Sequence, residues 1–512
     1  MQNKASDGSW VRWKYVLTES ENIENPLRHL STTFSLALLM MIVITVSPIA
    51  LVKAPTSGTL AFTTSGLAGT AGITCPNSNG NCYNNAAEPA IRADAAGNFY
   101  GSSENGLTGG TDAWRSTDGG LHYLTLVSPN SASAASNQFS PAGGDTDLAV
   151  ASQTNINGLY NVYVTSLALT NVYVSTSSDG GNTWLLNPTG ASVPGDDRPW
   201  IAAEGSSKVC VSYHSITATN DIFVTCSNDA GLTFAQTGNA FDANHLWLAA
   251  FQNAIGNLAI DPANHYIYQS LSGVATAAET TCTNCGLHAV WLAVSTDGGL
   301  TFTDHAVYVN PSTSVSYGHQ FVNVSVDRSG NIYVIFTDDH NLYYSFSIDH
   351  GTTWSSPTQV NQTPSNTAIF PWSTAGGSGK LDIVWYGTSY YDGKNTPDNY
   401  PMSAAWYVYF AQNLQATTNP ANFTQLAATP IIHYGGVCES GVSCTGNRDL
   451  YDDFGVAASP TTGLASIIYS NDQYVNSSTE PAAPGCTSST SNTGSCDHTD
   501  VATQTSGPGI FP

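Results

Sequence analysis

The sequence predicts an all-β fold in which one supersecondary unit is repeated around a ring, and three observations point to it. The chain contains 46 Gly, 25 Tyr and 11 Trp, and only 10% of its residues are charged. Short runs of β-branched and aromatic residues, such as 159–164 and 331–336, are bounded by Gly and Asn as strands often are. A pattern of the form S-x-D-x-G-x-T-aromatic occurs five times. The 512 residues alone suggest about three domains, but such a repeat predicts one closed unit.

The repeated pattern has the chemistry of a hairpin turn. Its Asp accepts backbone N–H bonds across the turn, its Gly tolerates positive φ, and its closing aromatic starts the next strand. Each copy follows an apolar alternating run, and only the first replaces the Thr, with His122. Successive copies are 61, 50, 68 and 52 residues apart. They span residues 116–123, 177–184, 227–234, 295–302 and 347–354.

These five copies resemble the Asp box of the bacterial neuraminidase repeat family, whose fold is the β-propeller of sialidases. The resemblance covers residues 86–475. It implies four-stranded antiparallel blades with an Asp-box hairpin between the third and fourth strands. In that family the boxes lie on the blade rim, away from the active site, so their residues are expected to be structural.

The domain organisation follows from aligning the strand that precedes each turn. Seven units result, so seven blades are favoured over six. The sixth unit has a strand but no clear box, and 500–505 is a candidate closing strand for the seventh. We expect a polar leader with a signal peptide or signal anchor over 1–54, a linker or closing segment over 55–85, the propeller over 86–475, and a Ser/Thr/Pro-rich tail over 476–512.

The N-terminus predicts export. An apolar run over 34–52 follows a polar leader, and its uninterrupted core, 36–46, fits a signal-peptide h-region better than a membrane span. We expect the rest of the chain to be extracellular or at the cell surface. Contact with a membrane is expected only through this segment, if it is not cleaved.

The cysteines agree with export, because all ten fall into close pairs that predict local disulfides. The Cys282–Cys285 pair also reads as half a zinc site or a redox pair, but the sequence has no second CxxC. The other pairs are Cys75 with Cys82, Cys210 with Cys226, Cys438 with Cys444, and Cys486 with Cys496.

The charge limits the partners. The formal net charge is −24, with 37 acidic and 13 basic residues, which argues against nucleic acid and anionic membranes. So few Lys and Arg leave little self-repulsion once carboxyl groups are protonated, below about pH 4. We therefore hypothesise an acidic external habitat, with an ordinary acidic secreted protein as the alternative.

The predicted site lies at the start of the innermost strands, which gather on one face of a propeller. Aligning the repeats brings carboxylates, Arg and His to that place, a set suited to polar ligands or acid–base chemistry. The alternative is that these side chains pair with the backbone and with one another, and only hold the blades together. The predicted catalytic residues are Glu88, Asp197, Arg198, Tyr451, Asp452 and Asp453. The predicted substrate-binding residues are Arg92, Asp147, His319, Trp372 and Arg448.

The resemblance implies a sialidase site with three arginines on the substrate carboxylate, a Tyr–Glu nucleophile and an Asp acid/base. The sequence departs from it, because Ala90–Ala93 replaces the family's Phe/Tyr-Arg-Ile-Pro motif. The available arginines are Arg92, Arg198 and Arg448, and Tyr451 is a nucleophile candidate without an obvious Glu partner.

Three functions fit the sequence. The first is an exported, sialidase-like glycoside hydrolase, an exo-sialidase or a related enzyme, using carboxylates at the channel mouth. The second is a non-catalytic surface propeller that binds glycan or protein, and the third is an envelope component. The expected ligand is a glycan or glycoprotein. No cofactor or metal is predicted, since there is no phosphate-binding Gly loop, H-E-x-x-H or EF-hand spacing. The sequence does not indicate an oligomeric state.

Overall fold

The structure is a computed structural model that describes residues 58–70, 82–130, 142–169, 171–191, 193, 195–216, 219–249 and 253–511. These residues belong to one compact unit. The predicted leader, 1–54, and its apolar run lie outside them, so the export signal remains a prediction. Within the described ranges, no helix is both long enough and apolar enough to cross a membrane.

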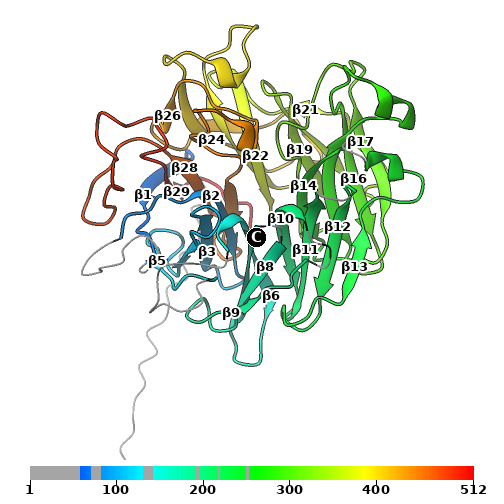
Figure 1. The fold of residues 1–512 in the computed structure, drawn as a ribbon, viewed down its shortest axis with the longest axis horizontal. Coiled ribbons are helices and arrows are strands. Elements are labelled where there is room, and N and C mark those ends of the chain that lie inside the picture. The colour runs from blue at the N-terminus through cyan, green and yellow to red at the C-terminus, as the bar shows by residue number, and fades with distance from the viewer. Residues whose placement is uncertain are drawn as a thin grey trace, which may run out of the picture. The chain divides into compact units, whose positions relative to one another are not determined.

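Seven antiparallel sheets follow one another around a central axis (Figure 1). This confirms the prediction of a seven-bladed propeller. Blade 1 contains β2 (Ala87–Ala93), β3 (Phe99–Glu104), β4 (Thr111–Ser116) and β5 (Leu124–Thr125). Blade 2 contains β6 (Gly144–Thr154), β7 (Tyr160–Ala168), β8 (Asn171–Ser177) and β9 (Leu185–Asn187). Blade 3 contains β10 (Asp196–Glu204), β11 (Lys208–Ser215), β12 (Ile222–Ser227) and β13 (Gln236–Asn239). Blades 4 and 5 contain β14 (Asn253–Ile260), β15 (Ile267–Gly273), β16 (Ala289–Ser295) and β17 (Thr303–Val309), then β18 (Asn323–Val326), β19 (Ile332–Thr337), β20 (Leu342–Ser347) and β21 (Thr358–Gln359).

The last two blades depart from the simple pattern. Blade 6 has a fifth strand, and blade 7 is closed by the N-terminal strand β1, which pairs with β29. The propeller therefore includes residues on both sides of 86–475. Blade 6 contains β22 (Thr367–Ala375), β23 (Leu381–Thr388), β24 (Ala405–Asn413), β25 (Thr424–Ala427) and β26 (His433–Tyr434), and blade 7 contains β27 (Gly455–Ala458), β28 (Ala465–Asn471), β29 (His498–Ser506) and β1 (Ala61–Gly66). The helices of the described residues are short 3-10 turns: η1 (Leu246–Leu248), η2 (Ala277–Thr281), η3 (Pro397–Asn399) and η4 (Gly441–Ser443).

The Asp boxes form the hairpins between the third and fourth strands of blades 1 to 5. In the fourth copy, Asp297 accepts bonds from the Ser295 hydroxyl at 2.9 Å, the Thr301 amide at 3.0 Å and the Thr301 hydroxyl at 2.6 Å. In the first copy the His122 ring replaces the Thr hydroxyl, 2.6 Å from Asp118. The boxes also contact the preceding blade, as when Arg115 donates to the Gly180 carbonyl at 2.6 Å. These contacts support a structural role for the boxes.

A recurrent bulge shapes the innermost strands. Glu88, Arg198 and Phe370 each precede a Pro and have φ values of 50°, 53° and 49°. The register of β2, β10 and β22 with the second strand of its blade shifts at these points. A bulge re-aims the side chain that it carries, and here it directs the side chains of Glu88 and Arg198 toward each other.

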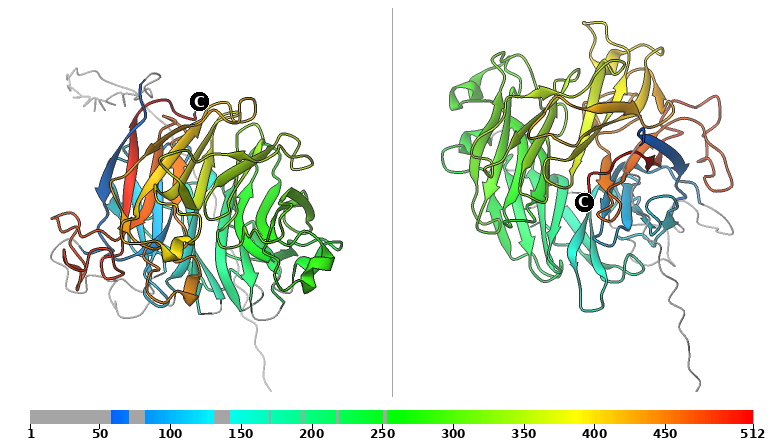
Figure 2. Two further views of the ribbon diagram at one scale, coloured as in Figure 1. Left: turned by 90° about the horizontal axis from the view of Figure 1, so that it is seen from above. Right: turned by 180° about the vertical axis from the view of Figure 1, so that it is seen from behind.

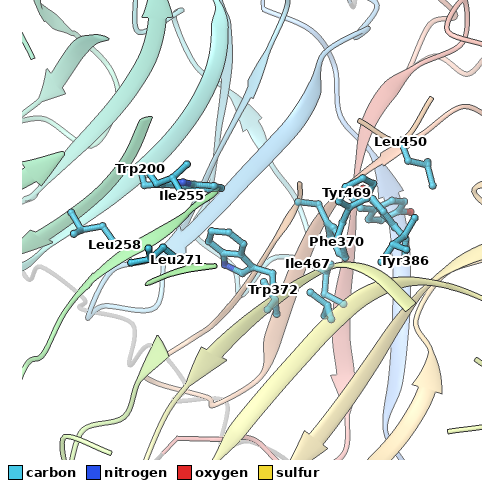
Figure 3. Close-up of a cluster of buried hydrophobic side chains, with 14 of the residues drawn as sticks. Trp200, Ile255, Leu258, Leu271, Phe370, Trp372, Tyr386, Leu450, Ile467 and Tyr469 are labelled. Carbon is cyan, nitrogen blue, oxygen red and sulfur yellow. The ribbon is translucent and has the colours of Figure 1, made fainter. Parts of the chain in front are cut away.

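An aromatic layer crosses the channel. The Trp200 ring lies 5.2 Å from Trp372 and 5.3 Å from Phe321, and Figure 3 shows both tryptophans among the buried side chains between the blades. One cavity, lined by Arg198 and Phe321, lies on the side where the inner strands begin. A second cavity of about 340 Å³, lined by Trp372 and Phe511, lies on the other side. Phe511, the last described residue, accordingly lies close to the inner strands, and Figure 2 shows the end of the chain from two further sides.

Four of the predicted disulfides are confirmed. Cys210 and Cys226 are directly paired across β11 and β12, as expected for a bridge within one blade. The Cys282–Cys285 pair is a disulfide, and the other two bridges are Cys438–Cys444 and Cys486–Cys496. The fifth predicted pair includes Cys75, which lies outside the described residues.

Candidate active site

The first cavity, here called the upper cavity, has a volume of about 500 Å³ and opens where the inner strands begin. This is the opposite end of the blades from the Asp boxes, because consecutive antiparallel strands reverse direction. The upper cavity brings together residues from strands of blades 1 to 4 and from the loops that precede β18 and β27. Five predicted site residues line it: Asp197, Arg198, His319, Arg448 and Asp452.

Two arginines join the blades beneath the mouth of this cavity. Glu88 is fully buried and accepts from Arg198 Nη1 at 2.5 Å and from Arg448 Nη2 at 2.8 Å. Arg198 also pairs with the buried carboxylate of Asp453, and Arg448 donates to Asp452 at 2.6 Å. Each guanidinium is therefore already compensated by protein carboxylates.

Tyr451 is not among the residues that line the upper cavity. Its ring lies 5.1 Å from the Arg448 guanidinium. Burial and the nearby carboxylates of Asp497 and Glu104 raise the pKa of its hydroxyl. A raised pKa makes a tyrosine hydroxyl a poorer nucleophile at neutral pH.

The structure places three predicted residues on the other side of the aromatic layer. Arg92 and Trp372 line the second cavity, here called the lower cavity, where the Arg92 guanidinium lies 5.4 Å from the Trp372 ring. Arg92 donates to the buried carboxylate of Asp147 at 3.0 Å. Asp147 also accepts from the Ile201 amide at 3.1 Å, so it ties β6 to β10. These residues do not join Arg198 and Arg448 at the upper cavity.

Glu104 is one of three carboxyl groups at the upper cavity that the sequence did not predict, together with Asp145 and Glu439. It ends β3, lines the upper cavity and is only 7% exposed. No hydrogen-bond donor or salt-bridge partner reaches it among the described residues. Burial raises the pKa of Glu104 well above its usual value. The negative charge of Asp145 is the next largest cause of this increase. A protonated carboxyl facing a cavity is suited to donate a proton.

Asp145 lies close to Glu104 on the neighbouring blade. Oxygens of Glu88, Glu104 and Asp145 all lie within 4.8 Å of one another. Asp145 lies 3.7 Å from Arg198 Nη1, which offsets its negative charge. Burial and the Asp145 carboxyl raise the pKa of Asp197, on the third blade, to about 6. The cavity thus holds carboxyl groups in contrasting environments.

The opposite wall carries a second polar group. His319 Nδ1 lies 2.5 Å from Asp339, and this hydrogen bond raises the pKa of His319. Glu439 lines the cavity, is bonded by Gln320, and has a pKa raised mainly by burial. Nearby, the buried Oδ1 of Asn253 has no hydrogen-bond partner among the described atoms.

The residues that line the upper cavity determine the sign of its electrostatic potential. Five carboxyl groups and two guanidinium groups contribute to it, with His214 and His319. Because the guanidinium groups are already paired, the remaining potential is negative unless carboxyl groups are protonated. A neutral or cationic ligand therefore fits this cavity better than an anionic one.

No protein-family model matches the sequence, and no curated protein matches it. Solved structures with a similar chain path include a Dyadobacter fermentans protein of unknown function, 11% identical over 87% of this chain and 98% of that one, with a TM-score of 0.43. The GH93 α-L-arabinofuranosidase of Fusarium graminearum is 14% identical over 63% and 93% of the two chains, with a TM-score of 0.42. A Hadza microbial sialidase is 13% identical over 58% and 63%, with a TM-score of 0.39. At these values, the function has to be inferred from this chain's own residues.

Proposed function

We propose that the protein is an exported glycoside hydrolase whose upper cavity cleaves the glycosidic bond of an uncharged sugar. Glu104 is the proton donor, and Asp145 is the carboxylate that acts at the anomeric carbon. The observation that carries this proposal is the placement of a buried, unpaired Glu104 within 4.8 Å of Asp145 at the cavity wall.

Hydrolysis needs two carboxyl groups in different protonation states on either side of the bond. Glu104 is buried beside another carboxylate, which favours its neutral form, while Asp145 faces the Arg198 guanidinium. Glycosidases that retain the anomeric configuration hold their two carboxyl groups about 5–5.5 Å apart, and inverting enzymes hold them about 6.5–9.5 Å apart. The close approach of Glu104 and Asp145 favours retention.

An anionic sugar such as a sialoside is a poor fit for this site. A sialidase-like arrangement needs free guanidinium groups, but Arg198 and Arg448 are both bound to carboxylates. Arg92 lies beyond the aromatic layer. An uncharged pyranoside or furanoside avoids the negative potential of the cavity and can stack on its apolar wall at Phe321.

Export is part of the proposal because the chain holds four disulfides among its described residues. Such bridges persist in oxidising compartments. A glycan is then an accessible substrate outside the cell.

The test is release of chromophore from a panel of neutral aryl glycosides and an aryl sialoside, between about pH 3 and pH 7. We expect turnover of a neutral glycoside, and a loss of about 10²–10⁴-fold in kcat for Glu104→Gln, since the variant keeps the shape but cannot donate a proton. Glu204→Gln, at the far end of β10, is the matched control and should retain activity.

Other outcomes change the assignment. Turnover of the sialoside that is lost in Arg198→Ala would support the sialidase prediction and overturn the choice of a neutral sugar. Saturable binding of a glycan without turnover on any substrate would favour the non-catalytic binding propeller.

A further inference from the structure

The lower cavity takes no part in the proposed reaction, and its lining differs from that of the upper cavity. Its volume of about 340 Å³ lies within the range of small-molecule sites. The inner strands of all seven blades contribute to its wall. The aromatic layer of Trp200, Phe321 and Trp372 lies between the two cavities. The lower cavity is therefore a separate place for a ligand.

Small side chains keep the lower cavity open. Ala93, Ala203 and Ala375 each lie five residues after the bulge residue of their strand, so they take the same place in three blades. A larger side chain at this place would fill part of the channel, so the alanines determine the volume available to a ligand. The remaining blades contribute Ala149, Ala259, Ser325 and Ala457.

The charge of the lower cavity comes from Arg92. Among the described residues that line this cavity, no other residue is charged. The Arg92 side chain is 24% exposed, whereas its partner Asp147 is 1% exposed and does not line the cavity. The Asp147 carboxylate also accepts from the amides of Leu148 and Ile201, at 2.8 and 3.1 Å. The cavity is therefore lined by the guanidinium and not by the carboxylate that it pairs with.

Arg92 is held in place and keeps donors for a ligand. Its Nη1 donates to the Ile91 carbonyl at 2.8 Å, and its Nη2 donates to Asp147 at 3.0 Å. Its guanidinium also lies 5.4 Å from the Trp372 ring. A guanidinium has five N–H donors, and these two bonds to described residues use two of them. A fixed guanidinium with further N–H groups is suited to bind a carboxylate.

A second guanidinium lies beside the cavity. The Phe511 ring is part of the cavity wall and lies 4.3 Å from the Arg328 guanidinium. Arg328 is exposed and forms no ion pair with a carboxylate of the described residues. The lower cavity is thus positive where the upper cavity is negative. An anionic ligand, which the upper cavity disfavours, fits the lower one.

We propose that the lower cavity binds a small organic acid with an apolar body. Its carboxylate would accept from Arg92, and its body would pack against Trp372 and the alanines. The charge-assisted bond provides the preference for an acid, and the burial of the apolar body adds to the affinity. This proposal does not depend on the reaction of the upper cavity.

The first experiment is isothermal titration of the full chain with sodium cinnamate and with cinnamamide at neutral pH and low salt. The amide has the same shape but no charge. We expect one cinnamate per chain, and binding of cinnamamide weaker by about tenfold or more, because it loses the charge-assisted hydrogen bonds. Absence of cinnamate binding, or equal affinity for the two compounds, overturns the proposal.

Two variants locate the ligand. Ala375→Leu fills the cavity without changing a charge and should abolish binding of both compounds. Ala427→Leu, on the outer strand β25 of the same blade, is the matched control and should bind cinnamate as the wild type does. Arg92→Met should reduce the affinity for cinnamate to that for cinnamamide and leave the latter unchanged. If Arg92→Met does not fold because Asp147 loses its cation, adding Asp147→Asn removes that charge and gives the same readout.

The remaining outcomes are also decisive. If Ala375→Leu still binds cinnamate, the ligand lies elsewhere and the proposal is wrong. Glu104→Gln should bind cinnamate as the wild type does, and loss of binding in this variant would place the acid in the upper cavity and overturn the proposal. Because the readout is heat of binding, it stands apart from any failure of the proposed hydrolase.

Discussion

Arg198 in blade 3 donates to Glu88 in blade 1 at 2.5 Å, so the two blades are joined across the channel although 110 residues separate the partners. Both residues occupy the left-handed region of φ and both precede a Pro. Such backbone strain persists only where the surroundings determine it. The same bulge in two strands thus produces one buried ion pair at the floor of the upper cavity.

The first prediction concerns this pair. Arg198→Met leaves Glu88 and Asp453 buried without their cation, and breaking a buried pair in this way costs about 3–5 kcal/mol of unfolding free energy. Adding Glu88→Gln to Arg198→Met should restore part of that loss. Denaturant unfolding measures both, with the exposed Arg328→Met as the control. Equal stability of the wild type and Arg198→Met would show that the pair contributes nothing.

The Asp boxes give a second prediction. Asp297→Ala removes four hydrogen bonds to a carboxylate and should cost about 1–3 kcal/mol. His122→Thr should be nearly neutral, since the hydroxyl takes over the contact of the ring. Thermal unfolding of the two variants checks this, and a similar loss in both would contradict it.

The pH dependence of stability gives a third prediction. Burial raises the pKa of Asp382 to about 8 and those of Asp196 and Asp304 to about 7. Each folded pKa exceeds the unfolded value of about 3.9. Their stabilisation is therefore complete below about pH 4 and is lost as the pH rises through about 7–8.

Hydrogen bonds act in the opposite direction in the boxes, where they help to lower the pKa of Asp229, Asp297 and Asp349 to about 2. That stabilisation is present above about pH 4 and is lost as the pH falls toward 2. Maximum stability should lie near pH 4–5, in agreement with the hypothesis of an acidic habitat. Scanning calorimetry between pH 2 and 9 measures it. Asp382→Asn should flatten the alkaline decline, and loss of structure already near pH 4 would refute the hypothesis.

The fold could be predicted because its signal is local and repeated. Each box specifies a turn through residues four positions apart, such as Asp297 and Thr301, and five copies indicate the blade. Closure by β1 had no such signal, since its partner β29 lies more than 400 residues away and the pairing depends on the whole ring.

The site was predictable only where the inner strands begin. Alignment found Glu88, Arg198 and Asp452, but it could not show that a bulge at the start of β6 turns Asp145 to the upper cavity while Asp147 lies below. Arg92 sits four residues further along its strand than Glu88, beyond the aromatic layer. Glu104 ends a second strand, away from the strand starts that the repeats bring together.

The last prediction separates the roles of the two proposed catalytic carboxyl groups. A carboxylate close to the acid attacks the anomeric carbon and forms a glycosyl-enzyme intermediate, which water then hydrolyses with overall retention. Proton NMR of the first product formed by the wild type should show the configuration of the substrate. Asp145→Ala should abolish turnover, and azide, occupying the vacated space, should restore it on a substrate with a good leaving group and give a glycosyl azide of inverted configuration. In Glu104→Ala, azide should instead intercept the intermediate and give the retained azide. An inverted wild-type product would reassign Asp145 as a general base acting through water, and rescue of Asp197→Ala in place of Asp145→Ala would move the nucleophile to the third blade.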